Sequence, residues 1–206
     1  MSLWMFVIVI LPIPIVALIG NRDDLVLLAY GVGIALLAAG IEIGAEKALA
    51  GAGLTLGFGL RAFLLFGLVE ESLKLFAITA ARRPTPRGSR LVRAALVCAV
   101  GFASTENAIY VIGFSKTLVG ANLAAASLIR MFLPLAFHLA DAPLLVSGYI
   151  VKGFKPVAGL VLATLLHGFY DLFASAPIGA GARVAYMVIV VGFFASAAIF
   201  RKAATL

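Results

Sequence analysis

The chain has 206 residues, of which 64% are hydrophobic and 12% are charged, and its formal net charge is +7. Soluble globular domains are about one quarter charged, so this composition excludes a soluble protein and predicts an integral membrane protein. The basic residues gather at the ends of apolar segments instead of alternating with aromatic residues, which argues against a partner made of nucleic acid.

Seven apolar segments follow one another, each close to or above the ~20 residues that a helix needs to cross the hydrocarbon layer. They cover residues 3–20, 25–41, 54–80, 91–114, 122–151, 156–174 and 182–200. Pro12 and Pro14 interrupt the first segment, which favours a bent spanning helix over a removed signal peptide. We therefore predict one all-α integral membrane domain over residues 1–206, a polytopic helix bundle of about seven transmembrane helices.

Basic residues are distributed unequally between the two sides of these spans. If the loop at 82–90 is cytoplasmic, Lys47, Lys116 and Arg183 lie outside. The cytoplasmic side then carries Arg22, Arg82, Arg83, Arg87, Arg90, Arg93, Lys152, Lys155, Arg201 and Lys202. The positive-inside tendency thus places the N-terminus outside the cell membrane and the C-terminus in the cytoplasm. We expect anionic lipid to contact the basic segment from Arg82 to Arg93.

The third to sixth spans contain five of the nine acidic residues and both histidines. These residues are Glu70 and Glu71, Glu106, His138 and Asp141, and His167 and Asp171. An ionisable group at the bilayer centre costs about 2.5–3.5 kcal/mol on insertion scales. Four helices that all accept this cost indicate a functional core, which we place at about residues 54–175.

Residue counts place these groups at one depth. With a rise of about 1.5 Å per residue, they lie about 15–20 Å from the shared membrane face, near the middle of a ~30 Å layer. Spacings of three or four residues put Lys74 on one face with the glutamates, and Asp141 and Asp171 on one face with their histidines. Four polar faces are therefore predicted to converge, with Asn107 at the same level.

Two imidazoles and one carboxylate from separate helices match the ligand set of hydrolytic zinc sites, which leave a fourth position for water. Glu106, His138 and His167 are the candidate metal ligands, and a further carboxylate would accept the proton of the water. Without a metal, a Glu–His pair could activate water directly, with Asn107 or a histidine stabilising the oxyanion. Both routes hydrolyse an amide bond.

Other interpretations of the intramembrane residues stay open at this point. Chains of Asp, Glu and His in membranes also form proton relays, so a proton-coupled membrane transporter is the second hypothesis. Any single pair of these residues could be a structural ion pair or hydrogen bond. Arg130 is expected to extend outward to the membrane surface, with binding of a substrate carboxylate as the alternative.

Four motifs occur in order on these spans. They are Glu70-Glu71-Ser72-Leu73-Lys74, Phe102-Ala103-Ser104-Thr105-Glu106-Asn107, His138-Leu139-Ala140-Asp141 and His167-Gly168-Phe169-Tyr170-Asp171. Over about residues 62–173, this ordered set resembles the PrsW family of intramembrane proteases, which cleave membrane-bound anti-sigma factors. The double glutamate and the final motif are also similar to CAAX prenyl endopeptidases and bacteriocin-processing enzymes, which carry a histidine where this chain has Glu106.

The resemblance implies an intramembrane endopeptidase that acts on a membrane-associated, anti-sigma-factor-like protein. It implies that Glu70 or Glu71 activates the water and that Glu106, His138 and His167 complete the site. Related enzymes are described both as metallopeptidases and as metal-free glutamate peptidases. A carboxylate at position 106 is a good zinc ligand, which favours a zinc enzyme.

The same resemblance assigns supporting roles. Lys74 would neutralise one of the paired glutamates, and Asp171 would orient His167 by a hydrogen bond to its imidazole ring. The superfamily also resembles the anterior-pharynx-defective subunit of gamma-secretase, a seven-helix scaffold. A noncatalytic membrane scaffold is therefore the third hypothesis.

Overall fold

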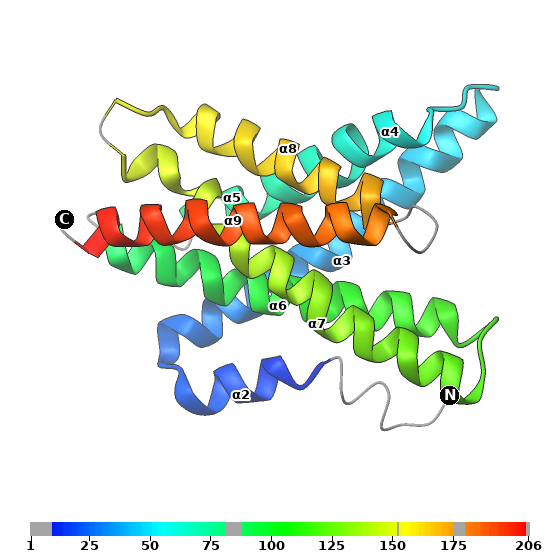
Figure 1. The fold of residues 1–206 in the computed structure, drawn as a ribbon, viewed down its shortest axis with the longest axis horizontal. Helices are drawn as coiled ribbons and strands as arrows, with labels where there is room; N and C mark the ends of the chain where they lie inside the picture. Colours follow the sequence, from blue (N-terminus) through cyan, green and yellow to red (C-terminus); the bar gives the residue numbers. More distant parts are fainter. Residues whose placement is uncertain (1–9, 81–87, 152, 175–179, 205–206) are drawn as a thin grey trace.

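The computed structural model describes residues 10–80, 88–151, 153–174 and 180–204 (Figure 1). All regular elements in these ranges are helical, which confirms the predicted all-α fold class. They are α2 (Pro12–Ile19), α3 (Arg22–Gly51), α4 (Phe58–Leu60), the π-helix η1 (Arg61–Leu68), α5 (Val69–Ala80), α6 (Gly88–Phe114), α7 (Gly120–Leu145), the 3-10 turn η2 (Ser147–Tyr149), α8 (Pro156–Ala174) and α9 (Ala180–Ala204). By length and composition, five helical stretches of the described chain could cross a membrane.

The predicted spans agree with these helices to different degrees. The sixth, 156–174, coincides with α8, and the fourth and fifth begin within three residues of α6 and α7. The third is divided among α4, η1 and α5, and much of the first lies outside the described residues. The structure thus supports a membrane protein with five long spanning helices, and the predicted count of seven is not established.

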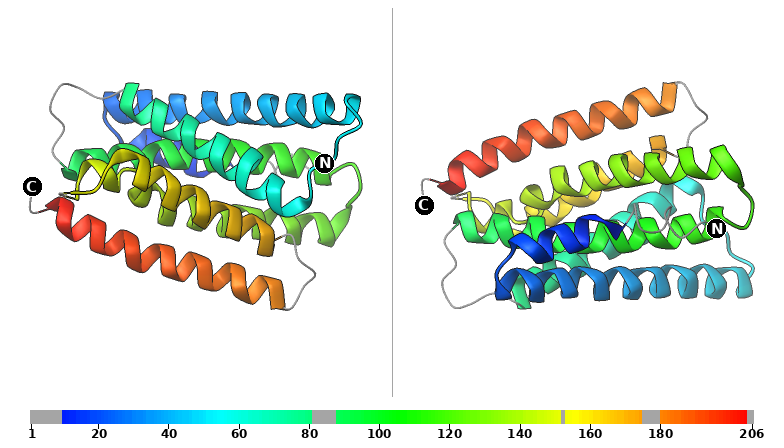
Figure 2. Two further views of the ribbon diagram at one scale, coloured as in Figure 1. Left: turned by 90° about the horizontal axis from the view of Figure 1, so that it is seen from above. Right: turned by 90° about the horizontal axis from the view of Figure 1, so that it is seen from below.

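The long helices run side by side, with α3 and α9 at opposite edges of the bundle (Figure 2). Helices α5, α6, α7 and α8 lie between these edges. Buried apolar side chains from α3, α5, α6, α7 and α8 form a common core that includes Ile78, Phe102 and Leu145. The inner helices therefore provide the enclosed positions at which polar residues are shielded from lipid.

Helices α3 and α6 cross at two glycines that leave no room for a side chain. A Cβ atom added to Gly31 would lie 2.2 Å from the carbonyl oxygen of Cys98, and one added to Gly101 would lie 2.4 Å from that of Leu28. Small residues allow such close backbone contact in membranes, where lipid offers no hydrophobic driving force between helices. The crossing fixes α3 against the helix that carries Glu106.

We expect Gly101→Ala to destabilise the protein by about 1–3 kcal/mol, because the added methyl group meets backbone atoms that must shift. Thermal unfolding of the full chain in detergent would measure this loss. Gly113→Ala, on the same helix, is the matched control, since a Cβ there meets nothing within 4 Å. Equal melting temperatures for the two variants would contradict a close α3–α6 contact.

The segment before the two glutamates is the π-helix η1, where the sequence predicts an ordinary α-helix. π-Helical turns are rare and occur frequently at functional sites. η1 packs closely on α8, because a Cβ atom on Gly67 would lie 2.9 Å from the carbonyl oxygen of Thr164. It continues directly into α5, whose first turn carries Glu70 and Glu71.

Helix α3 continues beyond the predicted end of the second span at residue 41 and reaches Gly51. Its N-terminus is fixed by a capping box in which Asn21 and Asp24 each accept a hydrogen bond from the other's backbone N–H. Asp24 also pairs with Arg93 of α6 at 2.6 Å. The prediction ended the helix too early because charged residues follow residue 41, although these have good helix propensity. As a result, Glu42 lies within the helix.

Candidate active site

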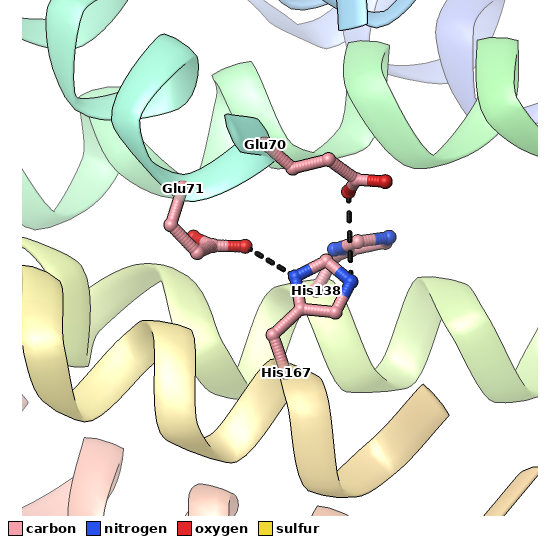
Figure 3. Close-up of side chains that lie close together, drawn as sticks. All are labelled: Glu70, Glu71, His138 and His167. Atoms are coloured by element: carbon pink, nitrogen blue, oxygen red, sulfur yellow. Dashed lines mark hydrogen bonds and ion pairs between the residues drawn. The ribbon is translucent and has the colours of Figure 1, made fainter. Parts of the chain in front are cut away.

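Four ionisable side chains from three helices meet inside the bundle (Figure 3). Glu70 and Glu71 come from α5, His138 from α7 and His167 from α8. Their exposed fractions are 5%, 0%, 2% and 3%, so all four side chains are buried within the bundle. One potential ligand atom from each residue lies within 4.8 Å of those of the other three. The structure thus brings these four predicted site residues together, and we call them the Glu–His cluster.

Glu71 is the most heavily bonded member of the Glu–His cluster. Its Oε1 accepts hydrogen bonds from Lys74 Nζ and His167 Nδ1, both at 2.6 Å. Lys74 is itself buried, and its second carboxylate neighbour is Glu70 at 3.6 Å. The other oxygen of Glu71 has no hydrogen-bond partner among the described residues. Asp141 is a further buried carboxyl group close to Glu71, and its Oδ1 also lacks a partner there.

The contacts of His138 determine its tautomer. Its Nδ1 lies 3.0 Å from Lys74 Nζ, and its Nε2 lies 2.8 Å from Glu106 Oε2. An ammonium group only donates and a carboxylate accepts, so Nδ1 accepts from Lys74 while Nε2–H donates to Glu106. The lone pair of His138 Nδ1 is therefore directed at Lys74, whose ammonium group also donates to Glu71.

His167 presents its other nitrogen to the cluster. In the neutral imidazole, Nδ1–H donates to Glu71 and the lone pair lies on Nε2. Glu70 Oε2 and Asp171 Oδ2 each lie 3.5 Å from Nε2, too far for a strong hydrogen bond. The Nε2 lone pair is thus available to a metal ion or a water molecule.

Glu106, which the sequence suggests as a metal ligand, lies beside the Glu–His cluster instead of within it. Its Oε2 accepts from His138, and its Oε1 lies 2.7 Å from Arg130 Nη2. The guanidinium of Arg130 also stacks over the Tyr110 ring, 3.6 Å from the centroid. The expectation that Arg130 extends to the membrane surface is therefore wrong, because a buried carboxylate attracts it inward.

The predicted supporting residues lie around the cluster at different distances. Asp171 lies beside His167, and Asp141 is next to Glu71. Asn107 is only 1% exposed, and its Oδ1 has no hydrogen-bond partner in the described part of the chain. Its role in stabilising an oxyanion therefore stays a prediction.

The donor set of the Glu–His cluster fits a divalent metal ion. Two imidazoles and two carboxylates supply nitrogen and oxygen ligands, the types that bind zinc in hydrolytic sites. One oxygen each of Glu70 and Glu71 is buried without a hydrogen-bond partner among the described residues, so each can accept a contact from a bound cation or its water. A metal ion that bound His138 Nδ1 would replace the contact with Lys74.

Glu42 is a residue that the sequence did not indicate as part of the site. A cavity of about 140 Å³ is lined by residues of α3, α5 and α6, among them Glu42, Glu70 and Glu106. A helical signal was present, because Gly31, Ala35, Ala38 and Glu42 follow one another at steps of three or four residues and mark one face of α3. That signal was missed because Glu42 was placed just outside the predicted span.

Comparison with known proteins gives one result. The family model described as "PrsW family intramembrane metalloprotease" matches residues 24–197. This range contains all four motifs and every residue of the Glu–His cluster. No curated protein and no solved structure matches the chain.

Proposed function

Since the chain belongs to the PrsW family of intramembrane metalloproteases, we propose that it hydrolyses a peptide bond of a membrane-associated, anti-sigma-factor-like protein. The observation that carries this proposal is the Glu–His cluster, which gathers two carboxylates and two imidazoles in the interior of the helix bundle. Such groups are costly inside a membrane and mark functional sites. The family match favours a protease over the transporter and scaffold hypotheses.

Glu70 is the glutamate that would activate the water. It lines the cavity, and its Oε2 has no hydrogen-bond partner among the described residues. Glu71, in contrast, is fully buried and already accepts hydrogen bonds from Lys74 and His167. A base must reach both water and substrate, which favours the carboxylate that borders open space.

Zinc is the metal that we assign to this site. His138, His167 and Glu71 would hold it, while Glu70 stays free to accept a proton. When bound, zinc makes a coordinated water more acidic and polarises the substrate carbonyl. Asp171 would keep the imidazole of His167 oriented, and Lys74 would balance the charge of the paired glutamates.

The membrane topology is part of the same proposal. The N-terminus would lie outside and the C-terminus in the cytoplasm, with anionic lipid at the segment from Arg82 to Arg93. Arg93 also has a structural partner, because its side chain is bonded to Asp24 of α3. Much of that segment lies outside the described residues.

Metal content tests the ligand assignment. We expect purified protein to contain about one zinc ion per chain, as structural and catalytic sites do, and His167→Ala and His138→Ala to lose most of it. Elemental analysis measures the zinc content of each variant. Peptide hydrolysis is measured before and after treatment with a chelator. Glu46→Gln is the control, because that residue is half exposed and paired with Arg61.

Two outcomes would revise the proposal. Retained zinc in Glu71→Gln with loss in Glu106→Gln would return the ligand role to Glu106. Equal zinc in all variants, together with hydrolysis that survives chelation, would favour a metal-free glutamate peptidase.

A further inference from the structure

The cavity between α3, α5 and α6 combines apolar walls with carboxylates. Ala38, Phe102 and Tyr110 contribute apolar surface, while Glu42, Glu70 and Glu106 contribute the carboxyl groups. Its volume is about 140 Å³. A long side chain with an apolar stem and a polar end would find both kinds of surface here.

Glu42 is the carboxylate of this cavity that lacks a cation. Glu106 is bonded to Arg130, and Glu70 has Lys74 and His167 at 3.6 and 3.5 Å. In the described ranges, no salt bridge includes Glu42, and its buried Oε1 has no hydrogen-bond partner. A buried acceptor without a donor is costly, so the cavity favours an occupant that brings one.

The wider charge balance points to the same chemistry. Six carboxyl groups lie in or beside the site, namely Glu42, Glu70, Glu71, Glu106, Asp141 and Asp171. The basic side chains Lys74 and Arg130 face them, together with the imidazoles of His138 and His167. A divalent metal ion would supply two further positive charges and still leave the carboxyl groups in excess.

The face of α3 that carries Glu42 continues to a second carboxylate, Glu46. Glu46 lies one turn beyond Glu42 and shares its face of the helix. It pairs with Arg61 at 2.9 Å, and the two side chains are 44% and 37% exposed. A polar or charged chain segment could therefore approach Glu42 from the exposed end of α3.

We infer that this cavity receives a lysine or arginine side chain of the substrate, next to the bond that is cut, and that Glu42 recognises its charged end. The inference rests on the proposed proteolysis. Glu70 lines the same cavity, so the occupant would lie beside the reacting water. The aliphatic stem would contact the apolar wall, and the ammonium or guanidinium group would form a charge-assisted hydrogen bond with Glu42.

The test uses single-span peptides with a leucine–alanine host sequence and one guest residue that is lysine, arginine, norleucine or glutamate. Each guest is moved in turn through the positions around the cleaved bond. Full-length wild type, Glu42→Gln and Glu42→Lys are compared in detergent by mass spectrometry of the products. Glu46→Gln is the matched control, because it removes the same charge one turn away and outside the cavity.

We expect wild type to cleave lysine and arginine guests faster than norleucine at one position. Glu42→Gln should reduce that ratio by about tenfold, the scale of one hydrogen bond to a charged group. Glu42→Lys should favour the glutamate guest, and Glu46→Gln should keep the wild-type ratio. An unchanged ratio in Glu42→Gln, or a preference for norleucine, would overturn the inference and leave the proposed proteolysis intact.

A binding measurement separates this inference from the proposed function. If wild type cleaves none of the peptides, the proposed proteolysis is not supported for this set of substrates. Competition binding of the same peptides then tests the role of Glu42. Tighter binding of the lysine guest to wild type than to Glu42→Gln supports the cavity as a cation-binding pocket. Equal binding to both proteins overturns it.

Discussion

Glu70→Gln is expected to lower kcat for peptide hydrolysis by about 10²–10⁴-fold, the contribution that a general base makes. Gln keeps the shape of the side chain but cannot accept the proton of water. The variant should stay folded, because Glu70 Oε2 receives no hydrogen bond from the described residues. Cleavage of a membrane-anchored peptide by the purified full chain measures the loss of kcat. A thermal unfolding curve shows whether the variant is folded.

Glu71→Gln provides the contrast. This change weakens the 2.6 Å contacts with Lys74 and His167, so both hydrolysis and the melting temperature should fall. Glu46→Gln should change neither, because its pair with Arg61 is exposed. Full activity in Glu70→Gln, together with a folded and inactive Glu71→Gln, would exchange the roles of the two glutamates.

Lys74→Met is expected to destabilise the protein by about 3–5 kcal/mol, because removing one partner of a buried ion pair leaves an uncompensated charge. Lys74 is 3% exposed, and its ammonium group contacts Glu71 Oε1 at 2.6 Å and His138 Nδ1 at 3.0 Å. Chemical or thermal unfolding in detergent measures the loss. Adding zinc should restore part of it, since a metal ion would supply the missing positive charge.

Two further variants make this prediction specific. Lys74→Met combined with Glu71→Gln should recover stability relative to the single change, because the second substitution removes the uncompensated charge. Arg61→Met is the control, since it breaks an exposed pair with Glu46 and should cost no more than about 1 kcal/mol. A Lys74→Met protein as stable as the Arg61→Met protein would contradict a buried charge cluster.

The proximity of four predicted site residues could be anticipated from the sequence for a simple reason. Hydrophobicity and helix rise locate residues along the membrane normal, so counting placed Glu70, Glu71, His138 and His167 at one depth. The structure brings these four together within 4.8 Å. The boundaries of α8 were predicted correctly, because Pro156 gives this helix a clear start.

Rotations around the helix axes could not be predicted in the same way. Depth alone does not show that Glu106 turns to Arg130 and His138 while Glu71 turns to His167. The direction of Arg130 depends on a partner 24 residues away in sequence. Such contacts are decided by how neighbouring helices pack, and the spacing of residues on one helix does not contain that information.

The extent of α3 was missed for a different reason. Hydropathy falls after residue 41 and so predicts the end of a span there, yet a helix can leave the hydrocarbon core or line a polar cavity without ending. Because α3 continues to Gly51, Glu42 reaches the cavity that also contains Glu70. The geometry of η1 was equally hidden, since no single residue type marks a π-helix.

The π-helix η1 gives the third span a place at which its length could vary. Each wide turn holds more residues than an α-helical turn of 3.6, so losing one residue there could be absorbed as the turn tightens. The chain after residue 68 would then keep its rotation, and Glu70 and Glu71 would still point toward the imidazoles. A deletion of the same size between Glu71 and Lys74 in α5 would instead rotate the rest of the helix by about 100° and separate Lys74 from the glutamates. The two halves of one span should therefore differ sharply in the insertions and deletions that they accept.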